Sequence, residues 1–159
     1  MFIRFLEKIQ LTVGVIFLII FFIAIIIQVI TRYFGISVIW TEEVANYSFI
    51  WAIFMGAAVM VNRKDHFNFD LLEKKLKGKA RVTLSLVIDS ILLLFCAALC
   101  FYSFTALTSF WNYNWVTLPS IKMGYVWLSF PVMTITMVIY LFAHIAGGIR
   151  KLAVREAIK

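Results

Sequence analysis

Residues 40–70 are W-T-E-E-V-A-N-Y-S-F-I-W-A-I-F-M-G-A-A-V-M-V-N-R-K-D-H-F-N-F-D, and the interpretation of the whole chain starts from this segment. It begins with the acids Glu42 and Glu43, continues through an uncharged run from Val44 to Asn62, and ends in a basic loop. At a helical rise of about 1.5 Å per residue, the uncharged run spans roughly 28 Å, close to the thickness of a bilayer's hydrocarbon core. The segment therefore predicts a membrane-spanning helix with a different charge sign at each end.

The composition of the chain extends this interpretation to all 159 residues, of which 64% are hydrophobic and 14% charged, with a mean hydropathy of +0.97. Such values exclude an ordinary soluble domain. The charge-free runs lack the alternation of barrel strands and are long enough for helices. We predict an all-α integral membrane protein, a single domain over residues 1–159, whose four transmembrane helices cover about residues 11–32, 43–62, 82–110 and 124–147.

The net charge of +7 is explained by where the basic residues lie. All but two of the 15 Lys and Arg residues fall before the first run, between the second and third, or after the fourth; the exceptions are Arg32 and Lys122. Under the positive-inside rule, both termini and the middle loop are expected to be cytoplasmic. The surplus of bases is therefore a topology signal, and no nucleic-acid partner is predicted.

Two short amphipathic segments are expected in the membrane interface, where they would contact lipid. Residues 2–9 combine apolar and charged side chains in a short amphipathic turn, and the apolar run that follows them is too long for a cleavable signal peptide. Residues 63–81 mix phenylalanines and leucines with lysines that can extend to anionic headgroups. Both termini are expected to remain on the cytoplasmic side.

The link between the first two spans combines charges of both signs. Arg32 ends the first span, and Glu42 and Glu43 begin the second. An ion pair between Arg32 and one glutamate would make this end nearly neutral. In the alternative interpretation, Thr41 is the N-cap of the second helix, and the acids are simply favoured by the helix dipole.

Small residues follow one face of the second span. Ala45, Ser48, Ala52 and Gly56 recur at helical spacing, which lets another helix approach closely. The expected neighbour is the first or fourth span of this chain, or else a second membrane protein.

Asp89 lies about seven residues inside the third span, where an acid requires an explanation. His144, at a similar depth in the fourth span, is the best partner within the chain. The alternatives are that the span overhangs, leaving Asp89 near the headgroups, or that Asp89 belongs to a proton relay. Cys96 and Cys100 are expected to be small packing residues in mid-membrane. His66 and Asp70 are four residues apart, but two candidate ligands are too few for a metal site.

Taken together, these residues resemble the small membrane subunit, the Q-type or DctQ-like subunit, of the tripartite ATP-independent periplasmic (TRAP) transporters. The resemblance rests on the order of several motifs over nearly the whole chain. They are R-Y from Arg32, W-T-E-E-V-A-N-Y from Trp40, G-A-A from Gly56, D-H-F-N-F-D from Asp65 to Asp70, and L-P-S-I from Leu118. The family often has Gly before the loop histidine where this chain has residues 62–65, a departure that concerns loop shape.

No nucleophile paired with a base is visible, so no enzymatic activity, cofactor or metal is predicted, and the resemblance indicates a different role. It implies a scaffold that braces a large multi-span transport subunit, which takes up an organic acid with sodium after a periplasmic substrate-binding protein has captured it. C4-dicarboxylates and sialic acids are familiar cargoes of the family. The matching residues are expected to serve hairpin geometry and subunit contact: Arg32, Trp40, Glu42, Glu43, His66 and Asp70. The small-residue face of the second span and the Asp89 face of the third are the two candidate contact surfaces, in a multi-pass protein of the bacterial inner membrane.

Two other function classes stay open. A membrane anchor of a redox complex would bind haem through histidines on facing helices, but only His66 and His144 exist and both are expected near the same side. A self-sufficient small channel or carrier would need a polar path at mid-depth, and the spans offer chiefly Gln28, Asp89 and hydroxyl groups.

Overall fold

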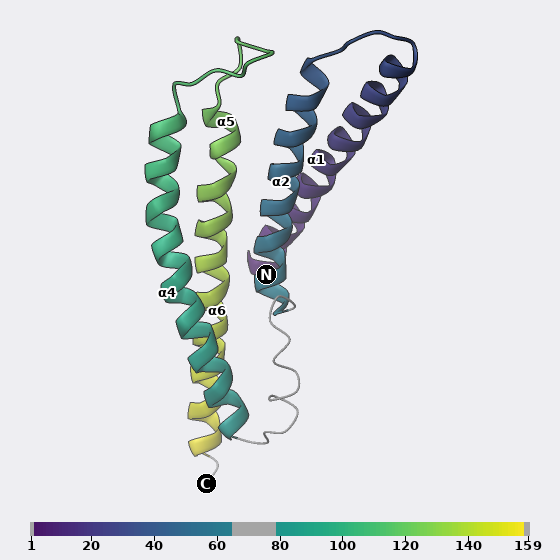
Figure 1. Ribbon diagram of the computed structural model, residues 1–159. Coiled ribbons are helices and arrows are strands. Elements are labelled where there is room, and N and C mark those ends of the chain that lie inside the picture. The colour runs from purple at the N-terminus through teal and green to yellow at the C-terminus, as the bar shows by residue number, and fades with distance from the viewer. Residues whose placement is uncertain (1, 65–78, 158–159) are drawn as a thin grey trace.

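The computed structural model describes residues 2–64 and 79–157 (Figure 1), and in this part of the chain every regular element is a helix. The helices are α1 (Phe2–Tyr33), α2 (Trp40–Arg63), α4 (Lys79–Phe110), the short α5 (Gly124–Trp127) and α6 (Ser129–Ala157). Four of them are long and apolar enough to cross a membrane, and α5 continues into the fourth of these candidate spans. The predicted all-α fold with four spans is confirmed.

The four long helices form two antiparallel hairpins (Figure 1). Helix α1 packs on α2, α4 packs on α6, and contacts between α2 and α6 join the two pairs. We call the end with the two connections, residues 34–39 and 111–123, the hairpin end. The opposite end, with residues 2–8, 64 and 148–157, is the terminal end. Towards the hairpin end, α1 leans away from α2, so the two helices diverge there (Figure 1).

Helix α1 begins at Phe2 and runs without a break to Tyr33. The predicted interfacial turn over residues 2–9 is therefore the start of a long helix and not a separate element. The second predicted interfacial segment falls largely on residues 65–78, which lie outside the described residues.

The fourth span is divided in two near its start. Helix α5 ends at Trp127 and α6 begins at Ser129, with Leu128 between them. Pro131 has no N–H, so it cannot donate to the carbonyl of Trp127 four residues earlier. The kink predicted at Pro131 thus corresponds to an interruption three residues before it, while Val132 still donates to the carbonyl of Leu128.

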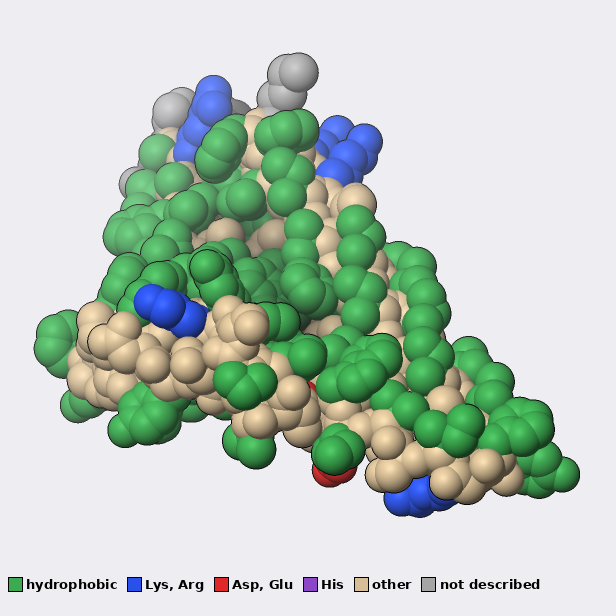
Figure 2. Space-filling model, turned by 90° about the horizontal axis from the view of Figure 1, so that it is seen from above, with side chains coloured by type: hydrophobic (Ala, Val, Ile, Leu, Met, Phe, Trp, Pro, Cys, Tyr) green, Lys and Arg blue, Asp and Glu red, His purple; other side chains and the backbone are tan. Residues whose placement is uncertain are grey.

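The core lies where α2, α4 and α6 meet. Its buried side chains are Ala58, Val61, Cys96, Met133, Met137, Tyr140 and Leu141. Much of the remaining surface is apolar: exposed large hydrophobic residues occur along α1, α2, α4 and α6, and Figure 2 shows hydrophobic side chains over most of the face seen from above. A soluble protein would not expose so much apolar surface, whereas lipid tails can cover it.

Candidate functional site

The paired acids of the W-T-E-E motif have different environments. The carboxylate of Glu43 accepts hydrogen bonds from the backbone N–H groups of Val116 and Thr117, at 2.9 and 2.8 Å, and from the hydroxyl of Thr117. Glu42 is exposed and forms no ion pair within the described residues. Of the two acids, Glu43 thus fastens the start of α2 to the connection of the other hairpin.

The connection that Glu43 holds is itself ordered by backbone hydrogen bonds. Trp115 donates to the carbonyl of Ile121, and Met123 donates to that of Tyr113, so residues 113–123 fold back as a small loop. The ring of Tyr47, one helical turn after Glu43, packs edge-on against Trp115 at a centroid distance of 4.6 Å. One turn further, the indole N–H of Trp51 donates to the carbonyl of Tyr125. The first half of α2 therefore contacts this loop at two successive turns and the start of the fourth span at a third.

The predicted N-cap role of Thr41 is wrong. The residue preceding α2 is Ile39, without a side-chain cap, and Thr41 lies within the first turn. Its hydroxyl donates to the carbonyl of Val38 and is fully buried. A hydroxyl that is buried this completely needs a local acceptor, and a carbonyl three residues back supplies it. Trp40, the first residue of α2, is exposed.

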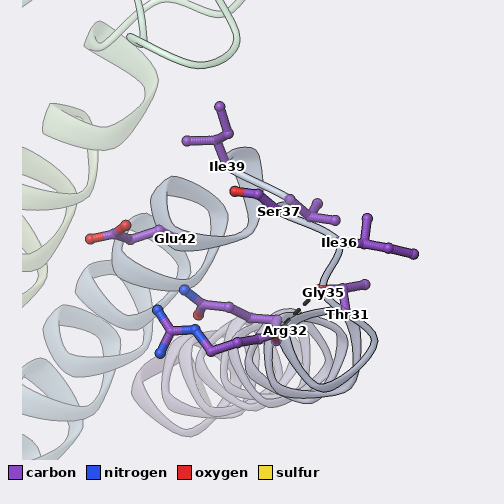
Figure 3. A pocket seen from close by; sticks show the side chains of 9 residues that line it. Thr31, Arg32, Gly35, Ile36, Ser37, Ile39 and Glu42 are labelled. Atoms are coloured by element: carbon purple, nitrogen blue, oxygen red, sulfur yellow. Dashed lines mark hydrogen bonds between the residues drawn. The ribbon is translucent and has the colours of Figure 1, made fainter.

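Arg32 and the two glutamates do not form the predicted ion pair. In the described part of the chain, the salt bridges join Glu7 to Arg63 and Asp89 to Lys64. Because the carboxylate of Glu43 is hydrogen-bonded to Thr117, Glu42 is the remaining candidate for an ion pair with Arg32 at this end. Instead, Arg32 and Glu42 line the same open hollow, of about 280 Å³, between the diverging ends of α1 and α2 (Figure 3).

The small-residue face of α2 is used within the chain over most of its length. Ala45 and Ser48 are buried, and a Cβ placed on Gly14 of α1 would lie 3.2 Å from Cβ of Met55 and 3.7 Å from the carbonyl oxygen of Ala52. Helix α1 thus crosses α2 closely at Gly14. At Gly56, a Cβ would meet nothing within 4 Å. The stripe is therefore buried within the chain at Ala45 and Ser48, approached by α1 at Ala52, and open at Gly56.

Asp89 is buried, and its ion partner is Lys64 and not the predicted His144. The Asp89 carboxylate accepts a hydrogen bond of 2.7 Å from Lys64 Nζ, which also donates to the Ser85 hydroxyl at 2.8 Å. Lys64 ends α2 in the left-handed backbone conformation, with φ of 61°. This C-terminal turn directs the lysine to α4, so the pair ties the two hairpins at the terminal end.

A further polar contact between the hairpins was not predicted. Gln10 is buried on α1, donates to the hydroxyl of Thr136 at 2.8 Å, and accepts from the hydroxyl of Tyr140. The sequence contained a weak signal, because Gln10 lies just outside the predicted first span and Thr136 and Tyr140 are four residues apart on one face of α6. Nearby, Glu7 accepts from Asn62 and Arg63, joining the start of α1 to the end of α2.

Within residues 2–64 and 79–157, no group of three His, Cys, Asp or Glu residues is placed to hold a metal ion. His66 and Asp70 lie outside the described residues. Cys96 and Cys100 are free; Cys96 is buried against Met137, in agreement with a packing role. Several of the described polar residues therefore join helices to one another, and others line an open hollow at the hairpin end.

Comparison with known proteins assigns the chain to a family. Residues 21–151 match the family model described as "Tripartite ATP-independent periplasmic transporters, DctQ component". The chain belongs to the DctQ family. One relative, from Haemophilus influenzae (strain ATCC 51907 / DSM 11121 / KW20 / Rd), is described as a TRAP transporter small permease protein and is 34% identical over 77 residues. That match spans 46% of this chain and 47%, about half, of the relative.

Membership in the DctQ family confirms the resemblance drawn from the sequence motifs. The family match includes Arg32, the W-T-E-E motif and Asp89, and it begins after Gln10. This DctQ chain is a component of a transporter family and a multi-pass membrane protein with four candidate spans.

Proposed function

We propose that this DctQ chain is the small membrane subunit of a TRAP transporter, and that it braces a large multi-span transport subunit without holding the substrate. The observation that carries the proposal is the family match over residues 21–151. In the proposed complex, a periplasmic binding protein delivers an organic acid and the large subunit takes it up with sodium. The cargo is an organic acid of the C4-dicarboxylate or sialic acid type.

The polar contacts of the structure support a bracing role. Glu43, Lys64 and Gln10 each join one hairpin to the other, at three different depths. Side chains that hydrogen-bond across helices in this way stabilise a fixed arrangement. A scaffold that braces a larger subunit needs such internal ties.

Aromatic and basic side chains support a fixed depth in the bilayer. Trp111, Tyr113 and Tyr125 are exposed at the hairpin end, where aromatic rings favour the headgroup layer. Basic residues at the terminal end include Arg4, Arg63 and Arg150, all of which are exposed. We propose that the terminal end faces the cytoplasm and that the membrane is the bacterial inner membrane.

Purification with a tag tests the proposal directly. The chain, tagged and extracted from its native host in mild detergent, is expected to bring with it a much larger multi-span protein at about a one-to-one ratio, identified by mass spectrometry. Recovery of the chain alone as a stable homo-oligomer would overturn the bracing role.

An uptake assay tests the division of labour. Replacement of both Glu42 and Glu43 by Gln is expected to lower assembly or uptake, because the hairpin end loses its tie and an exposed charge. The ratio of uptake for two competing organic acids is expected to stay the same. Lys122→Gln, which removes an exposed charge at the same end, is the control. A changed substrate ratio in the double variant would place part of the substrate site on this chain.

A further inference from the structure

The hollow at the hairpin end holds two opposite charges that do not pair with one another. Its lining includes Gln28 and Arg32 from α1, Ser37 from the connection, and Glu42 from α2. Within the described residues, neither the guanidinium of Arg32 nor the carboxylate of Glu42 forms an ion pair. Figure 3 shows both side chains extending towards the same side of the hollow.

Exposed apolar side chains lie beside these charges, as expected for a site at the border of a bilayer. Ile36 and Ile39 line it and are exposed, and Val29 and Ile30 of α1 are exposed one turn or less below Arg32. Deeper between the helices, the rings of Phe21 and Phe49 stack at 5.0 Å. The hollow therefore combines polar and charged groups with a flanking surface that suits acyl chains.

We propose that this hollow binds the headgroup of a zwitterionic phospholipid bearing a primary ammonium, with its phosphate on Arg32 and its ammonium on Glu42. A guanidinium matches phosphate geometry, and a carboxylate accepts hydrogen bonds from an ammonium. A volume of about 280 Å³ lies just below the roughly 300–1,000 Å³ of sites for drug-sized ligands, which suits a headgroup whose tails lie outside. The proposal does not depend on the transporter role and applies to the chain by itself.

Native mass spectrometry of the full chain in detergent tests the proposal with three phospholipids of identical acyl chains. Phosphatidylethanolamine is expected to be retained at one copy per chain, in preference to phosphatidylcholine, whose quaternary ammonium cannot donate hydrogen bonds. Its retention is also expected to exceed that of phosphatidylglycerol, whose headgroup carries no cation that Glu42 could bind. Equal retention of all three lipids would overturn the proposal.

Variants of Arg32 and Glu42 test which part of the headgroup each charge binds. Arg32→Gln is expected to lower retention of phosphatidylethanolamine roughly tenfold, as the loss of one charge-assisted hydrogen bond implies. Glu42→Gln is expected to abolish the preference over phosphatidylcholine. Lys122→Gln, an exposed cation at the same end but outside the hollow, should change neither. Far-UV circular dichroism should show equal helix content in all variants, because Arg32 and Glu42 are exposed.

Two further outcomes would overturn the assignment to a lipid. In the first, soluble glycerophosphoethanolamine displaces the phospholipid at equal concentration, which would mean that the acyl chains contribute nothing. In the second, Arg32→Gln lowers recovery of a co-purifying protein while phospholipid retention stays unchanged, which would make the hollow a protein contact. Failure of the bracing role would instead appear as loss of the large partner, with lipid retention unaffected.

Discussion

Glu43 and Thr117 lie 74 residues apart in the chain, yet the carboxylate of Glu43 accepts a hydrogen bond of 2.8 Å from the backbone N–H of Thr117. The same carboxylate also accepts from Val116. Two backbone donors directed at one acid form a tie that a neutral amide cannot reproduce, since one side of the amide is itself a donor.

Glu43→Gln is therefore expected to lower the free energy of unfolding by about 1–3 kcal/mol, the cost of leaving a donor unmatched. Thermal unfolding in lipid-free detergent, followed by circular dichroism, measures the change. Glu42→Gln is the matched control and should leave the Tm unchanged, because Glu42 is exposed and unpaired within the described residues. Equal effects of the two variants would contradict the division of roles between the acids.

Gln10→Leu is expected to destabilise the packing of α1 against α6. The substitution removes the partners of Thr136 and Tyr140, and hydrogen bonds between membrane helices contribute about 0.6 kcal/mol on average, with a maximum near 1.7. Unfolding by a denaturing detergent measures the loss. Gln28→Leu is the same change on the same helix, but at the hollow, and should have a smaller effect. A larger loss from Gln28→Leu would show that the Gln10 contact contributes little.

Gly124→Ala is expected to destabilise the start of the fourth span by about 1–3 kcal/mol, as overpacking does. A Cβ on Gly124 would lie 2.8 Å from Cδ2 of Trp111, in a rigid ring system. Gly147→Ala is the control, because a Cβ there meets nothing within 4 Å and alanine favours a helix. Thermal unfolding gives the stability, and a shifted tryptophan emission spectrum would report displacement of Trp111. Two variants of equal stability would refute the close approach.

Lys64→Met is expected to destabilise the protein more than the double variant Lys64→Met/Asp89→Asn does. The single change leaves a buried carboxylate without its cation, whereas the double change removes the charge as well. Because half of the lysine side chain is exposed, the loss should be moderate, about 1–3 kcal/mol. A double-mutant cycle by thermal unfolding measures the coupling, and zero coupling would show that the pair contributes nothing to stability.

The spans could be predicted because the bilayer imposes a single requirement: each helix needs about twenty consecutive apolar residues without charged side chains. The segment from Val44 to Asn62 meets that requirement, and α2 follows it. The fold of the loop that Glu43 contacts could not be predicted. It depends on hydrogen bonds from the backbone N–H groups of Trp115 and Met123 to carbonyls on the opposite side of the loop. Nor could the partner of Asp89, because Lys64 reaches α4 only through a left-handed turn after α2.

The distribution of contacts along the chain has a consequence for biogenesis. Within the first hairpin, the tie of Glu7 to Asn62 and Arg63 and the crossing at Gly14 involve only residues 7–63. The partners of Glu43, Gln10 and Lys64 lie in the second hairpin, which the ribosome synthesises later. The first helical pair can thus close in the bilayer while α4 and α6 are still being synthesised. The second pair of helices then packs against the first pair. It supplies hydrogen-bond partners for Glu43, Gln10 and Lys64, which have none of these contacts before that step.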